Sequence, residues 1–176
     1  MNGLGIEWRE VDRIWAPWRM EYIKSAKDES GCVFCLIGRE RDDEGRLVLQ
    51  RGRYSYIVMN TYPYNNGHLV VTPYRHVPNL TDLSGEELSD AIWLVSYSIK
   101  LLRHVLNPDG FNIGANLGRV AGAGIADHVH FHIVPRWRGD TNYMTTISET
   151  RVLPEDLRVT YRKLLLGVGE LGPAYR

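Results

Sequence analysis

The sequence predicts an α+β domain with a mostly antiparallel sheet. Three features indicate this class: a pair of strand-forming segments joined by a turn, one long amphipathic helix, and two more strand-like segments after it. The chain has 176 residues, a length that suits one domain. No repeat or change of composition marks a linker, so residues 29–176 are expected to form a single domain.

The first strand-forming pair covers residues 54–59 and 68–72, which are rich in β-branched and aromatic residues. Pro63 and the Asn66-Gly67 dipeptide lie between the two segments and are strong turn signals. We therefore expect a hairpin-like pair.

A long helix is predicted over about residues 85–106. Ser84 and Glu87 match a capping box, and apolar residues then recur at helical spacing up to Leu102. Residues 111–117 and 128–135 are predicted to be strands, and a last helix is expected to begin near Pro154.

Residues 1–28 are a tryptophan-rich arm, expected to pack on the body or on a partner subunit. The 21 Lys and Arg balance the 21 Asp and Glu, which argues against binding nucleic acid through broad electrostatics. No apolar run approaches the roughly 18–20 residues that span a bilayer. The N-terminus also lacks the basic and then apolar order of a signal peptide. These features predict a cytoplasmic protein without a membrane partner.

The only two cysteines, Cys32 and Cys35, are separated by two residues. Such a pair could be a redox motif, half of a metal site, or two small buried thiols. The metal interpretation requires two histidines from elsewhere in the chain.

Three of the six histidines, His128, His130 and His132, alternate with apolar residues. Alternate side chains of a strand share one face, so the three imidazoles are expected to lie together, with the apolar residues toward a core. Adjacent imidazoles suit metal binding or phosphoryl chemistry. The preceding glycine-rich segment, residues 114–124, could bring backbone amides close to a phosphate, although it is neither a dinucleotide fingerprint nor a P-loop.

With these motifs the chain resembles the histidine-triad (HIT) family of nucleotide hydrolases and transferases. Residues 128–134 meet the family pattern His-φ-His-φ-His-φ-φ, where φ is apolar, and the resemblance extends from about Cys32 to Tyr143. It implies a HIT-like fold with a five-stranded, mostly antiparallel sheet, one long helix and a C-terminal helix. It also implies a homodimer in which the sheet continues across both subunits, or a tetramer made of two such dimers.

The resemblance assigns roles to individual residues. It implies that His130 attacks the α-phosphate of a nucleotide and forms a nucleotidyl-histidine intermediate, within a catalytic set of His130, His132, His68 and His128. It implies substrate contacts by Asn60, Asn116 and Trp137, and an adenine pocket lined by Phe34, Val58 and Val70. Many members have Gln where this chain has Gly124, so here a backbone amide would make that contact.

Zinc-containing members of the family pair a CxxC motif with two histidines. The resemblance therefore implies a structural zinc site formed by Cys32, Cys35, His76 and His128. If His128 binds zinc, it cannot also donate a proton to a leaving group. No organic cofactor is expected.

Residues 14–20 and 135–143 are similar to the bacterial branch that includes diadenosine tetraphosphate phosphorylases, and also to fragile-histidine-triad hydrolases. The expected activity is cleavage of dinucleoside polyphosphates at the α-phosphate through an adenylyl-histidine, with phosphate or water as the acceptor. Three alternatives stay open. They are hydrolysis of an AMP-amine phosphoramidate, a zinc-stabilised nucleotide-binding regulatory module without turnover, and a metalloenzyme with zinc on the triad itself.

Overall fold

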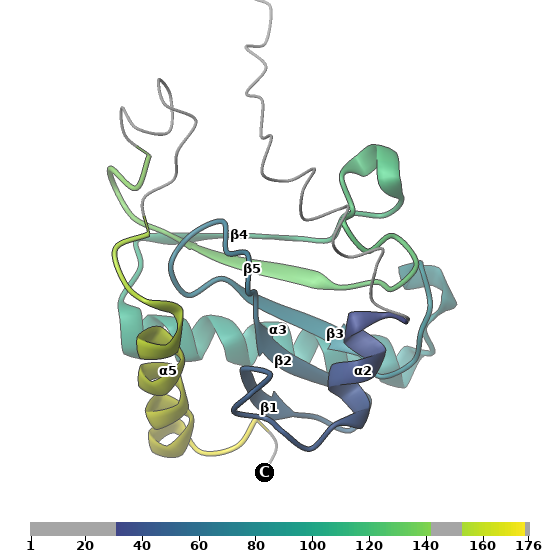
Figure 1. The fold of residues 1–176 in the computed structure, drawn as a ribbon, viewed down its shortest axis with the longest axis horizontal. Helices are drawn as coiled ribbons and strands as arrows, with labels where there is room; N and C mark the ends of the chain where they lie inside the picture. The colour runs from purple at the N-terminus through teal and green to yellow at the C-terminus, as the bar shows by residue number, and fades with distance from the viewer. Residues whose placement is uncertain (1–30, 142–152, 175–176) are drawn as a thin grey trace, which may run out of the picture.

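Five strands form one open sheet in the computed structural model, which describes residues 31–141 and 153–174 (Figure 1). Their order is β1-β2-β3-β5-β4, and every neighbouring pair is antiparallel. The strands are β1 (Val48–Arg51), β2 (Ser55–Met59), β3 (Leu69–Pro73), β4 (Gly110–Gly114) and β5 (Phe131–Arg136). The α-helices within these residues are α2 (Val33–Arg39), α3 (Gly85–Leu106) and α5 (Leu157–Leu171). The predicted α+β class is confirmed.

Helix α3 covers one face of the sheet and begins and ends where the sequence predicts. The Ser84 side chain accepts from the Glu87 amide and the Glu87 carboxylate accepts from the Ser84 amide, so the predicted capping box forms. Leu94 and Leu101 of α3 are fully buried in one core cluster with Ile57 of the sheet. Each such side chain contributes roughly 1.5–3 kcal/mol by leaving water.

Helix α2 lies on the opposite face of the sheet from α3 (Figure 1). Phe34 of α2 shares a second, smaller cluster with Val58 of β2 and Val70 of β3. Val58 and Val70 are direct partners across the two strands, whereas their neighbours in sequence, such as Ile57 and Val71, belong to the α3 side. The sheet therefore has an apolar layer on each face.

Helix α5 packs against α3 and against β1. It begins at Leu157, after Pro154, because Asp156 is the N-cap and its carboxylate accepts from the amides of Arg158 and Val159. Gly167 lies so close to α3 that an added Cβ would be 2.3 Å from Val105. The absence of a side chain at this position permits the close helix contact.

Two predicted strands are shorter than expected. β5 begins at Phe131 rather than at 128, because the Val129 amide donates to the Val77 carbonyl instead of to a neighbouring strand. β4 ends at Gly114 rather than at 117. Residues 1–28, the predicted arm, lie outside the described residues, and no described helix is long and apolar enough to cross a membrane.

Candidate active site and metal centre

Three histidines meet on the α2 side of the sheet, beside the start of β5. The ring centroids of His130 and His132 are 4.9 Å apart, and those of His132 and His68 are 5.1 Å apart. His68 immediately precedes β3, and His132 pairs in register with Val70 on that strand. His68 and His130 are buried, with exposed fractions of 0% and 5%. Two of the three imidazoles of the predicted triad, those of His130 and His132, thus lie together with His68, whereas the His128 ring contacts the cysteines.

The protonation of His130 follows from one hydrogen bond. Its Nδ1 lies 2.8 Å from the backbone carbonyl oxygen of His128. A carbonyl can only accept, so Nδ1 carries the proton and Nε2 keeps its lone pair. Burial lowers the pKa of His130, which favours the neutral ring. His130 is therefore a neutral imidazole with an unprotonated Nε2, which is what a nucleophilic histidine requires.

A chain of hydrogen bonds also determines the tautomers of His68 and His132. The Tyr64 amide donates to His68 Nδ1 at 3.1 Å, so the proton of His68 is on Nε2. That Nε2 lies 3.0 Å from His132 Nδ1 and donates to it, which places the proton of a neutral His132 on Nε2. Burial, reinforced by the neighbouring His132 and His130, lowers the pKa of His68 to about 3. Hence His132 can donate a hydrogen bond while His130 offers a lone pair.

The structure brings Asn60, a predicted substrate contact, next to His68. The Asn60 side-chain nitrogen is 3.4 Å from His68 Nδ1, and the Asn60 amide donates to the His68 carbonyl at 3.0 Å. Its side-chain oxygen accepts from the Tyr62 amide at 2.9 Å. Asn60 therefore contributes to the shape of the loop that connects β2 and β3.

The three residues predicted to line an adenine pocket lie in one cluster beside His130. The Phe34 ring is 4.9 Å from the His130 ring and 5.4 Å from the His128 ring. Val58 and Val70 complete this apolar patch on the sheet.

The remaining predicted substrate contacts are at different distances from His130. Asn116 is half-buried just after β4, whose last residue, Gly114, pairs with His132. Gly124 lies in the same β4–β5 connection. Trp137 follows the other end of β5, seven residues and roughly 20 Å of strand from His130. Within one chain, the structure does not bring Trp137 to the nucleophile.

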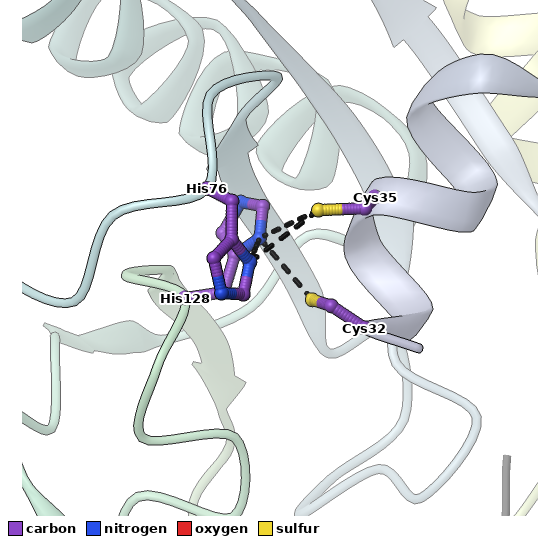
Figure 2. Close-up of side chains that lie close together, drawn as sticks. All are labelled: Cys32, Cys35, His76 and His128. Carbon is purple, nitrogen blue, oxygen red and sulfur yellow. Dashed lines mark hydrogen bonds between the residues drawn. The ribbon is translucent and has the colours of Figure 1, made fainter. Parts of the chain in front are cut away.

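Cys32, Cys35, His76 and His128 form a candidate metal centre (Figure 2). The cysteines lie at the start of α2, His76 follows β3, and His128 precedes β5. One donor atom from each residue lies within 4.8 Å of the others. His128 Nδ1 is 3.2 Å from Cys32 Sγ, 3.6 Å from Cys35 Sγ and 3.2 Å from His76 Nδ1.

These residues fit a tetrahedral ion. Zinc bonds to sulfur and nitrogen imply separations between ligand atoms of roughly 3.3–3.8 Å, close to those present. His128 Nε2 donates to the Pro73 carbonyl at 2.9 Å, so His128 Nδ1 presents its lone pair to the thiols, and both thiols are free. The four residues could therefore hold a metal ion.

The strand arrangement argues against a redox role for the cysteine pair, and the contacts of His128 limit its role in the triad. A thioredoxin-like redox motif belongs to a βαβ unit, whereas all described strand pairs are antiparallel. Because both ring nitrogens of His128 have partners, its connection to the triad is through its carbonyl group, which orients His130.

Arg51 holds the helix that carries the two cysteines, a role that no sequence motif indicated. Its guanidinium donates to the carbonyls of Ile37, Gly38 and Glu40 at the C-terminal end of α2, at 3.1, 3.2 and 2.8 Å. It also forms an ion pair with Asp43. Tyr64 was likewise missed, because its contact with His68 is made by a backbone amide that any residue but proline possesses.

Comparison with known proteins identifies related sequences and structures. A family model described as HIT domain matches residues 42–139. AP-4-A phosphorylase of Mycobacterium tuberculosis is 42% identical over 163 residues, which cover 88% of this chain and 83% of that protein. Adenosine 5'-monophosphoramidase HNT1 of Saccharomyces cerevisiae is 31% identical over 108 residues, covering 61% of this chain and 64% of that protein. A Zn-bound histidine triad family protein from Mycobacterium smegmatis has a TM-score of 0.65 and 27% identity, over 80% of this chain and 95% of that one.

Proposed function

This chain belongs to the HIT domain family, and we propose that it is an enzyme that cleaves dinucleoside polyphosphates, such as diadenosine tetraphosphate, at the α-phosphate. The observation that carries the proposal is the pair of tautomers: His130 offers a lone pair and His132, 4.9 Å away, offers a proton. The 42% identity to an AP-4-A phosphorylase supports the choice of substrate, and it favours inorganic phosphate as the acceptor.

In the first step His130 Nε2 forms a bond to the α-phosphorus, and the bond from that phosphorus to the bridging oxygen breaks. The electron pair leaves with the bridging oxygen, so diadenosine tetraphosphate would release ATP. His132 Nε2–H donates a hydrogen bond to the departing oxygen, and the proton itself when the leaving group is basic. The adenylyl-histidine is positively charged, and the His128 carbonyl stabilises it by accepting from Nδ1.

In the second step an oxygen of the acceptor attacks the same phosphorus and the nitrogen–phosphorus bond breaks. Its electron pair returns to His130 Nε2. Phosphate as acceptor gives ADP, and water gives AMP. A proton released by the acceptor replaces any that His132 lost.

We further propose that Phe34, Val58 and Val70 contact the adenine, and that Asn60, Asn116 and the amide of Gly124 contact the ribose and phosphates. Asn116 and Gly124 are supported by their position between β4 and the triad. Trp137 would contact the second nucleotide, which extends away from His130.

We propose that the metal is zinc and that its role is structural. The set of two thiolates and two imidazoles is typical of closed, structural zinc sites. Bound there, zinc would join α2, the segment after β3 and the residue whose carbonyl orients His130. Two cysteines that form no disulfide also support a location in the reducing cytoplasm.

A homodimer with a continuous sheet is proposed from the edge of the sheet. β4 is an edge strand, and Ile113 on it is 49% exposed. Ile92 of α3 is 50% exposed as well. Pairing of two β4 strands would satisfy the edge and bury such side chains.

The products of diadenosine tetraphosphate, with and without inorganic phosphate, test the proposal. We expect ATP and ADP with phosphate, and ATP with AMP or no reaction without it. Two molecules of ADP formed without phosphate would place the cleavage at the wrong phosphate and contradict attack by His130 on the α-phosphorus. No product under either condition would also contradict the proposal.

Hydrolysis of an AMP-amine phosphoramidate is the second candidate. It is favoured by the proton on His132, because an amine leaves only after protonation, and by the 31% identity to a monophosphoramidase. The ratio of kcat/KM for diadenosine tetraphosphate to that for the phosphoramidate separates the candidates.

The alternative of a metalloenzyme with zinc on the triad itself lacks support, since the metal cluster found among the described residues contains neither His130 nor His132.

A further inference from the structure

The loop between β2 and β3 is attached to the far end of β5 by a buried asparagine. Asn65 is only 4% exposed. Its side-chain nitrogen donates to the Pro135 carbonyl at 3.0 Å and to Asp140 Oδ2 at 2.8 Å. Both donor hydrogens of this amide are therefore used to connect the loop to β5 and to the turn after it.

Asp140 is held in place by several donors. Arg136 donates to both carboxylate oxygens, from Nε at 2.6 Å and from Nη2 at 2.8 Å, and the Trp137 amide donates at 3.1 Å. Arg136 Nη1 also donates to Asn112 on β4 at 2.7 Å. Asp140 is thus a fixed acceptor, anchored to the two neighbouring strands β4 and β5.

This attachment lies next to the hydrogen bond that determines the tautomers of His68 and His132. Tyr64 directly precedes Asn65, and its amide donates to His68 Nδ1 at 3.1 Å. The His68 amide in turn donates to the Asn65 carbonyl at 3.2 Å. A displacement of Asn65 by about 1 Å would take the Tyr64 amide out of hydrogen-bond range of His68.

We propose that Asn65 and Asp140 are positioning residues, which hold the Tyr64 amide against His68 so that His132 keeps its proton on Nε2. The inference rests on the proposed function for its catalytic consequence, because that proton is the one donated to the leaving group. Neither residue touches the reacting atoms. Without the attachment, His68 can change tautomer and donate from Nδ1, and His132 then loses its fixed orientation.

The test uses Asn65→Leu, which keeps a similar volume and removes both donors, with Asn66→Leu as the matched control. Asn66 lies in the same loop, but its side chain accepts from Thr160 on α5 rather than binding Asp140. Two AMP derivatives are compared: an alkylamine phosphoramidate, whose leaving group needs a proton, and a p-nitrophenyl ester, whose leaving group does not.

We expect Asn65→Leu to lower kcat for the phosphoramidate about 10- to 100-fold and for the p-nitrophenyl ester less than about 3-fold. Asn66→Leu should change both by less than about 3-fold. Equal losses on the two substrates in Asn65→Leu would indicate a structural role only and would overturn the inference.

Nitrogen-15 NMR of the histidine rings gives a readout that needs no substrate. We expect unprotonated Nδ1 in His68 and His132 of the wild type and of Asn66→Leu, and mixed tautomers in Asn65→Leu. Asp140→Asn weakens the acceptor of the Asn65 hydrogen bond but leaves the sequence of the loop unchanged. It should give the same change to a smaller extent. Unchanged tautomers in both variants would overturn the inference. An inactive wild type with this pattern of tautomers would instead contradict only the proposed function.

Discussion

Two backbone groups give neighbouring histidines opposite roles. A neutral imidazole has one donor and one acceptor nitrogen, so a fixed partner on one nitrogen determines the other. The His128 carbonyl makes His130 an acceptor at Nε2, and the Tyr64 amide, through His68, makes His132 a donor at Nε2. Nucleophilic attack and leaving-group departure need these two states at the same time.

The burial of His68 predicts that acid destabilises the protein. Its pKa is about 3 in the folded state and near 6.5 when exposed, so between these values the unfolded chain binds a proton that the folded chain does not. The contribution of neutral His68 to the free energy of unfolding is therefore fully present above pH 6.5, and it decreases as the pH is lowered toward 3. By pH 4 the loss amounts to roughly 3 kcal/mol.

Urea denaturation of wild type and His68→Gln at pH 7 and pH 4 measures this loss. The variant should lose less stability between the two pH values, by roughly the same 3 kcal/mol. His104→Gln is the control, because His104 pairs with Glu170 at the surface and is not in the site. Equal losses in wild type and His68→Gln would show that His68 is not kept neutral by burial.

At the level of single elements, the helices and strands that depend on local sequence signals could be predicted. α3 begins at a capping box and ends before Asn107, which adopts a left-handed conformation, and Pro108. Helix α2 was not predicted, because it has only seven residues and is held by tertiary contacts such as those of Arg51. The tautomers could not be predicted either, since they depend on where the loop containing Tyr64 lies.

Arg51→Met tests how α2 supports the metal centre. Methionine keeps much of the apolar stem and removes the bonds to the α2 carbonyls, so we expect stability to fall by about 1–3 kcal/mol. Because Cys32 and Cys35 lie on α2, zinc affinity should fall about 10- to 100-fold. Competition with a chromogenic chelator measures the affinity. Arg46→Met, which removes an ion pair with Glu40 and no bond to an α2 carbonyl described above, is the control. An unchanged zinc affinity in Arg51→Met would contradict the role.

At the level of the whole molecule, β4 and α3 predict how two copies associate. We expect the wild type to sediment as the proposed dimer in analytical ultracentrifugation, and Ile113→Asp, which places a charge on the edge strand, to sediment as a monomer. Leu166→Asp is the matched control, since Leu166 is 70% exposed on α5, which packs against β1 at the opposite edge of the sheet from β4. A monomeric wild type, or a dimeric Ile113→Asp, would contradict the proposed continuous sheet.

The overall architecture could be predicted because the histidine pattern, the long helix and the strand pair agree with one family fold. The grouping of His68, His130 and His132 followed from strand alternation and from the resemblance. The distance of Trp137 from His130 could have been anticipated from strand length, because seven residues of extended chain separate the two.

The covalent intermediate on His130 is the most direct test of the mechanism. Protein quenched during turnover of diadenosine tetraphosphate should gain the mass of one adenylyl group, located by peptide mass spectrometry on His130 and labile to acid. His130→Asn, which keeps a side chain of polar character, should be folded, should not be labelled and should lose at least about 1000-fold in kcat. Labelling of another residue, or full activity in His130→Asn, would contradict the account.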